Sequence, residues 1–215
     1  MFENFDIAYF LMTITVLLLS ISFHEWAHAV TADAMGDPLP RSQGRVTLWP
    51  LAHLDPAGTV MMIFTTIAHF GLGWGKPVQS NPSAYTKFSR RISGFLVVGA
   101  GPLSNLFIAT VLSQIIRWNI VQDPFYITWL DIAVRVNIGL CLFNLLPIAP
   151  LDGSKLLAYS LPQAMGDSFL RFSEKAGPMV LLILVMAPAF GIPSPLGMIL
   201  GPVRGALYNY MTGVS

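Results

Sequence analysis

The sequence predicts an all-α membrane protein with about four transmembrane helices and a membrane-dipping hairpin. Hydrophobic residues make up 54% of the 215 residues and charged residues only 11%, against about 25% charged in a typical soluble domain. The mean hydropathy is +0.63. Five long stretches of the chain contain no Asp, Glu, Lys or Arg. So few charges cannot cover the surface of a soluble domain, and a lipid bilayer is therefore the expected surrounding.

The charge-free stretches predict the helices in chain order, since a membrane-spanning helix needs about 20 mostly apolar residues. The first stretch extends through two histidines and predicts a helix over about 7–34. The third predicts a helix over about 92–117, and the fourth, extended toward its N-terminal side, one over about 127–151. We expect these three helices to form the core of a single domain over 1–215. A C-terminal helix over about 177–200 follows.

The second charge-free stretch is interrupted by glycines at both ends. Gly58 lies near its start and Gly75 at its end, and Lys-Pro and Asn-Pro dipeptides follow. A residue that precedes proline favours extended backbone. We therefore interpret about 56–82 as a hairpin that dips into the membrane without crossing it.

The distribution of basic residues supports this topology. If the N-terminus is outside and the hairpin does not cross, nine of the 12 basic residues lie inside, as the positive-inside rule expects. A full crossing by the hairpin would weaken that bias. The nine residues expected inside are Arg41, Arg45, Lys76, Lys87, Arg90, Arg91, Lys155, Arg171 and Lys175. The three expected outside are Arg117, Arg135 and Arg204.

Charge and cysteine content exclude two classes of partner or site. The net charge is +1 and the chain has no basic run, so nucleic acid is not an expected partner. The single cysteine, Cys141, excludes an internal disulfide framework and a CxxC metal site.

A metal-binding pattern, His24-Glu25-Trp26-Ala27-His28, ends the first apolar stretch. Positions i and i+4 share one face of a helix, so both histidines can bind one zinc ion. Glu25 lies between them, where it can take a proton from the attacking water. Ionisable residues at membrane depth are costly and are usually functional. The pattern therefore predicts a zinc site inside the membrane.

A catalytic zinc site needs a third protein ligand and one open position. Asp152 is the best candidate, because it follows two prolines at the end of the fourth apolar stretch, at the depth expected for His28. Such irregular backbone occurs at membrane depth only where it is buried in protein or lines a wet cavity. The alternative is that Asp152 caps a helix at the membrane interface.

Other polar residues are weaker candidates. The side chain of Asn105 is costly to bury at membrane depth without a hydrogen-bond partner. It therefore either faces the active-site cavity or joins two helices. His53 and Asp55 could line the entrance, although a loop or cap role is the simpler reading. His69 lies in the predicted hairpin.

Together these motifs resemble the site-2 protease family of intramembrane zinc metalloproteases. The resemblance spans most of the chain, through HEWAH, GRVTLWPLAHLDPAGT, GWGKPVQSNP, GAGPLSN and NLLPIAPLDG. A membrane HExxH followed about 120 residues later by NxxPxxxLDG is a highly specific combination. It implies a three-helix core and one Zn²⁺ per chain. The implied ligands are His24, His28 and Asp152.

The resemblance also implies roles for three further residues. Glu25 would be the general base. Asn144 would steady the substrate carbonyl or the tetrahedral intermediate, and Asn105 would help to hold the substrate. Two departures from the family pattern fall in the loop that would contact the substrate. Trp49 replaces a usual asparagine, and Gln79-Ser80 interrupts a proline-rich segment.

The function implied by the resemblance is cleavage of transmembrane segments in membrane-protein substrates, as in regulated intramembrane proteolysis. We expect a multi-pass protein of a bacterial inner membrane, and a regulatory membrane partner, because the sequence shows no PDZ or nucleotide-sensing domain. The alternatives are a zinc-binding membrane sensor or pseudoprotease, and a metal transporter. Glu25 argues against the first alternative, and the convergence of the best ligands at one depth argues against the second.

Overall fold

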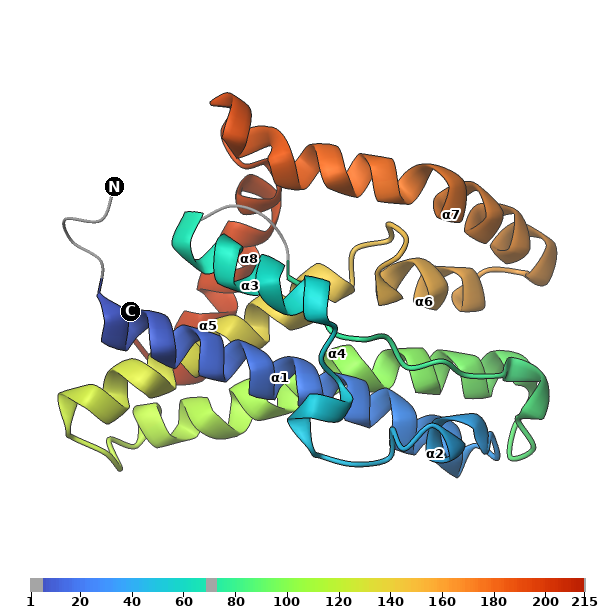
Figure 1. Ribbon diagram of the computed structural model, residues 1–215, viewed down its shortest axis with the longest axis horizontal. Coiled ribbons are helices and arrows are strands. Elements are labelled where there is room, and N and C mark those ends of the chain that lie inside the picture. The colour runs from blue at the N-terminus through green and yellow to red at the C-terminus, as the bar shows by residue number, and fades with distance from the viewer. Residues whose placement is uncertain (1–5, 69–72, 215) are drawn as a thin grey trace.

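The computed structural model describes residues 6–68 and 73–214, and within them the chain is almost entirely helical (Figure 1). Helices and short 3-10 turns are joined by loops, and the described residues contain no strand beyond one isolated bridge. The predicted all-α class is therefore confirmed.

Three long apolar helices form the centre of the molecule. They are α1 (Ile7–Ala34), α4 (Arg90–Arg117) and α5 (Pro124–Asn144), and each is long and apolar enough to cross a membrane. They pack against one another and lie side by side in Figure 1. Large apolar side chains on their outer surfaces are exposed, among them Phe107 at 65%. Lipid is the solvent that suits such a surface, so the protein is a membrane protein.

The third core helix ends earlier than the expected residue 151. α5 ends at Asn144, and the chain then turns through Pro147 and Pro150 before α6 (Asp152–Ser160) begins. The prolines cannot donate the backbone hydrogen bonds that a helix would need there. The break matters because it places Asp152 at the first turn of a separate helix.

The predicted hairpin consists of a short helix and an extended arm. α3 (Pro56–Ala68) contacts α1, and at 13 residues it is too short to span a membrane. Residues 73–81, called the arm below, contain no helix and form the bridge between Gly75 and Leu54. A Cβ on Gly58 would lie 2.0 Å from the carbonyl oxygen of Trp74, so glycine allows the arm to approach α3 closely.

The prediction of a single C-terminal helix over 177–200 is wrong. The structure has α7 (Gln163–Met186), a 3-10 turn η3 (Ala187–Phe190) and α8 (Pro195–Thr212), with α7 and α8 bent by 95°. Gly191 adopts a φ of +75°, which favours glycine. Prolines on both sides of it prevent one continuous helix. If the bent pair is counted as one broken span, the described residues hold up to four spans, in agreement with the expected number.

The remaining elements connect the core helices or pack against them. α2 (Leu39–Ser42), η1 (Pro50–Ala52) and η2 (Pro82–Ala84) belong to the loops between α1 and α4. α8 packs against α4 and α5, where Tyr208 is buried in a cluster with Ala109, Val134 and Ile138.

Candidate metal centre

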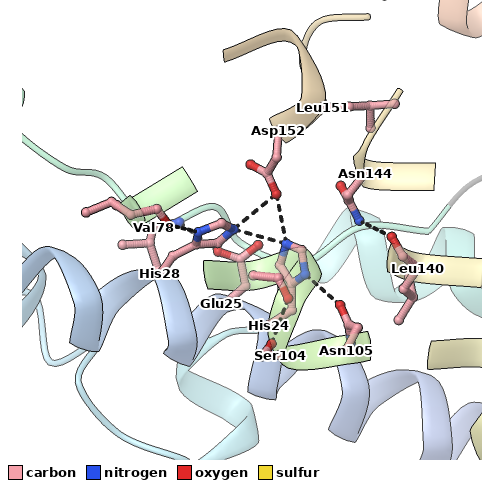
Figure 2. Close-up of polar contacts among 12 residues, drawn as sticks. His24, Glu25, His28, Val78, Ser104, Asn105, Leu140, Asn144, Leu151 and Asp152 are labelled. Atoms are coloured by element: carbon pink, nitrogen blue, oxygen red, sulfur yellow. Dashed lines mark hydrogen bonds and ion pairs between the residues drawn. The ribbon is translucent and has the colours of Figure 1, made fainter. Parts of the chain in front are cut away.

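Two turns of α1 and the start of α6 bring three metal-binding side chains together. The Nε2 atoms of His24 and His28 lie 3.1 Å apart, and each lies 3.1 Å from Oδ2 of Asp152. Figure 2 shows the three groups converging on one point. Both histidines are buried, and they are one helical turn apart on the face that the sequence pattern predicted.

The spacing of these three donors fits zinc. A tetrahedral zinc with bonds of about 2.0–2.1 Å holds its ligand atoms about 3.3 Å apart, close to the observed 3.1 Å. Two imidazoles and one carboxylate leave one coordination position open, as catalytic zinc sites require. Among the described residues, no other group of His, Cys, Asp and Glu has a comparable arrangement.

Asp152 reaches this site without acting as a helix cap. Leu151 occupies the N-cap position of α6, and no side chain caps that end. The Asp152 carboxylate points instead toward the histidines, where its side chain is only 15% exposed. The geometry therefore favours the metal-ligand interpretation over the interfacial cap.

The other nitrogen of each imidazole is held by α4. Nδ1 of His28 lies 2.7 Å from the carbonyl oxygen of Val97, and Nδ1 of His24 lies 2.7 Å from Oδ1 of Asn105. Both acceptors require a proton on Nδ1, which leaves the Nε2 lone pairs free for a metal. α4 therefore fixes both the tautomers and the ring orientations.

Asn105 does not lie where a substrate contact would. Its side chain is completely buried and does not line the cavity at the metal site. Its Nδ2 donates to the backbone oxygen of Ser20 and to Oδ1 of Asn137, while Oδ1 faces His24. Both donor positions of the amide and one acceptor position of Oδ1 are thus used inside the helix bundle, and this geometry favours an orienting contact with His24 over the expected substrate contact.

Glu25 and Asn144 face the cavity beside the metal site. The cavity has a volume of about 420 Å³ and is lined by residues of α1, α4, α5, α6 and the arm. Oε2 of Glu25 accepts a hydrogen bond of 2.9 Å from the backbone N–H of Val78. Nδ2 of Asn144 donates to the carbonyl oxygen of Leu140, one turn back along α5. Both side chains therefore lie within the space that a bound peptide would enter.

Two of the weaker sequence candidates, His53 and Asp55, do not line this cavity. His53 is completely buried, with Nε2 at 2.7 Å from the carbonyl oxygen of Thr47. Asp55 accepts a bond from the N–H of Gly58 at the start of α3. His69 lies outside the described residues.

Sequence reasoning missed three buried polar residues near the site. Asn137 and Ser20 complete the network around Asn105, with Nδ2 of Asn137 donating to Oγ of Ser20. An amide within an apolar helix was an available signal for Asn137. Arg45 is 4% exposed and donates one hydrogen bond to the arm, at the carbonyl oxygen of Lys76. Its place in a loop gave no signal of that role.

The fold and this site define a membrane protein with a metal-binding HExxH helix, and its sequence is similar to those of several curated proteins. The chain is 33% identical over 187 residues to "Putative zinc metalloprotease YwhC" of Bacillus subtilis, covering 81% of this chain and 80% of that protein. It is 30% identical over 186 residues to "Putative zinc metalloprotease Rip2" of Mycolicibacterium smegmatis, covering 84% and 68%. It is 32% identical over 172 residues to "Putative zinc metalloprotease Rip3" of Mycobacterium tuberculosis, covering 79% and 36%.

These similarities show the family. The chain belongs to the site-2 protease-like family of zinc metalloproteases. It is a zinc-dependent hydrolase that acts on peptide bonds. No family model matches the sequence. No solved structure is significantly similar to it.

Proposed function

We propose that this chain is an intramembrane endopeptidase that cleaves transmembrane segments of other membrane proteins. The observation that carries the proposal is the position of the metal-binding cluster. His24 and His28 lie within α1, a helix long and apolar enough to span a membrane, and α1 packs against two further such helices. A protease site built into such helices would meet its substrates at membrane depth.

His24, His28 and Asp152 are the proposed zinc ligands, and Glu25 the proposed general base. Bound zinc would lower the pKa of water and polarise the scissile carbonyl group. Glu25 would take the proton of the attacking water and then pass it to the leaving amine. The N–H of Val78 supports this role, because it holds the Glu25 carboxylate toward the cavity.

Asn144 is the proposed contact for the substrate carbonyl oxygen. Its amide donates one hydrogen bond to the carbonyl oxygen of Leu140, and both residues line the cavity. A side-chain amide so placed can donate to an oxygen that gains charge during the reaction. The donor would be most useful in the transition state, where that charge is greatest.

The substrate is proposed to bind as an extended strand beside the arm. A helical peptide bond is shielded by its own hydrogen bonds, so a transmembrane substrate must unwind locally before it is cut. Gly75 and Pro77 of the arm line the cavity. An unwound segment could add to that edge by backbone hydrogen bonds.

The proposed setting is a bacterial inner membrane with the N-terminus outside. The curated relatives named above are bacterial, and the excess of basic residues in the expected inner segments supports the orientation. In this setting the metal site lies toward the inner side. Control by a regulatory membrane partner, as in regulated intramembrane proteolysis, belongs to the same proposal.

The proposal is tested by mapping the cleaved bonds. Membranes from cells that express the wild type or Glu25→Gln are compared by mass spectrometry for new membrane-protein termini. We expect termini that depend on Glu25 to lie within apolar segments of about 20 residues. Cleavage confined to soluble loops would contradict the intramembrane site, and zinc uptake into vesicles without cleavage would favour a transporter.

Asn105→Ala is expected to weaken zinc binding about 10- to 100-fold, because it removes the partner that orients His24. The measurement is zinc retention against a competing chelator in the purified protein. Ser113→Ala is a control, since Ser113 is also buried on α4 and its hydroxyl donates within that helix. Equal zinc retention in the two variants would refute the orienting role.

A further inference from the structure

Arg45 places a buried guanidinium group beside the arm. The residue is 4% exposed. Nη1 donates to the carbonyl oxygen of Ala52, and Nη2 donates to that of Lys76. Nε is buried without a partner, and none of the ion pairs found in the described part of the chain includes Arg45. Burying this charge without a direct carboxylate partner is costly, so the two carbonyl contacts need an explanation.

The two carbonyl groups belong to segments that must be aligned with each other. Ala52 lies in η1, and Lys76 lies in the arm. The backbone N–H of Lys76 also donates to the carbonyl oxygen of His53, at 2.8 Å. Both backbone groups of Lys76 are therefore bound on the same side. A planar guanidinium can hold two such oxygens at once in a fixed geometry.

The same edge of the arm reaches the proposed general base. Val78 follows Lys76 by two residues, and its N–H donates to Oε2 of Glu25. In extended backbone, residues two apart direct their polar groups to the same side. The backbone polar groups of Gly75 and Pro77 therefore point to the opposite edge of the arm, and both residues line the cavity. Arg45 thus holds the edge that faces Glu25, and among residues 6–68 and 73–214 no hydrogen bond to the backbone of Gly75 or Pro77 is found.

His53 is a second buried residue beside the arm, and its carbonyl oxygen accepts from the N–H of Lys76. Within the described part of the chain, its Nδ1 has no hydrogen-bond partner. Burial lowers the pKa of His53, and the charge of Arg45 lowers it further. The bond to the Thr47 carbonyl and the charge of Glu25 oppose this shift without reversing it. A carbonyl oxygen can only accept, so the contact with Thr47 is an N–H donation from Nε2. The two charged side chains that bind the backbone of the arm are therefore Arg45, at Lys76, and Glu25, at Val78.

We infer that Arg45 is a positioning residue that fixes the arm against Glu25, so that the free edge of Gly75 and Pro77 can bind an extended peptide backbone. This inference rests on the proposed function, because it concerns how a peptide is aligned with the zinc site. Arg45 touches neither the metal-binding cluster nor the cavity. It acts through Lys76.

Two probes that bind zinc separate this role from a general effect on stability. Acetohydroxamate can contact only the metal, whereas a peptidyl hydroxamate adds an extended backbone that needs the arm. Their dissociation constants are measured with the purified full-length protein in detergent, together with zinc content. For Arg45→Gln we expect binding of the peptidyl hydroxamate to weaken about 10- to 100-fold. Zinc content and acetohydroxamate binding should stay unchanged.

Three further variants make the test specific. Arg45→Lys should restore part of the lost affinity, because an ammonium group can still bond one carbonyl but lacks the fork. Gly75→Ala should reproduce the selective loss, because its Cβ would lie 2.6 Å from Cγ2 of Ile21 and 3.1 Å from the carbonyl oxygen of His53. Arg41→Gln is the matched control, since Arg41 is exposed and paired with Asp33. It should leave both probes unaffected.

The outcomes distinguish this inference from the proposed function. Equal weakening of both probes in Arg45→Gln, or no weakening of either, would overturn the positioning role. If Arg45→Gln does not fold, Arg45→Lys and Gly75→Ala decide, and normal peptidyl hydroxamate binding in both would overturn it. A wild type that contains no zinc and binds neither probe would instead refute the proposed function.

Discussion

Glu25→Gln is expected to reduce peptide-bond cleavage by about 10²- to 10⁴-fold, the usual contribution of a general base, while zinc content stays at the wild-type value. Glutamine has the same shape, and its amide oxygen can still accept the bond from the N–H of Val78. It cannot take a proton from water at neutral pH. The measurement is the cleavage rate of a membrane substrate identified by terminus mapping, with zinc determined in the same preparation.

Glu174→Gln is the matched control for this prediction. Glu174 is exposed on α7, outside the group of residues that lines the cavity. The same change of charge and shape at that position should leave the cleavage rate within about twofold, as expected for a surface substitution. Wild-type cleavage by Glu25→Gln would show that another group activates the water.

Gly101→Ala is expected to abolish tight zinc binding and, with it, cleavage. A Cβ at this position would lie 2.2 Å from Nε2 of His28 and 2.6 Å from Nε2 of His24. The imidazoles cannot simply rotate away, because Nδ1 of each is held by α4. One added methyl group must therefore displace either the proposed ligands or the helix. We expect a loss of zinc affinity of at least about 100-fold, the upper range for disturbing groups that orient ligands.

Gly99→Ala tests whether this effect is local. Gly99 lies on the same helix, and its added Cβ would meet only Leu156 and Leu103, at 3.6 and 4.0 Å. These are ordinary contact distances, so zinc content and cleavage should be close to those of the wild type. Full zinc binding by Gly101→Ala, measured by competition with a chelator, would show that the histidines can move without losing the metal.

The sequence predicted which side chains come together at the centre of the site, because the geometry that relates the two histidines is local. His24 and His28 are four residues apart on one helix, and helical periodicity alone places them on one face. Asp152 was predicted as the third ligand because its expected depth in the membrane matches that of His28. It ends an apolar segment in which prolines break the helix. The structure brings these three side chains within 3.1 Å of one another.

Predictions that depended on contacts between distant segments were less accurate. An asparagine in an apolar helix must find a partner, but the sequence does not say whether that partner is a substrate or another side chain. For Asn105 the partners are His24, Ser20 and Asn137, from two other helices. The prediction of a single C-terminal helix was wrong for a different reason. Hydropathy alone does not reveal the turn at Gly191, which lies between prolines.

By itself, the sequence determined that this is an all-α membrane protein and which residues can bind zinc. Amino-acid composition indicates whether water or lipid surrounds the protein, and helix geometry relates residues that are a few positions apart. Neither inference requires knowledge of the tertiary structure. Only the tertiary structure decided that Asn105 contacts His24, and that Arg45 and Glu25 bind opposite ends of a short arm segment. These pairings join residues that lie 31 to 81 positions apart along the chain. They exist only because the packing of helices and loops brings particular backbone and side-chain groups into hydrogen-bonding range.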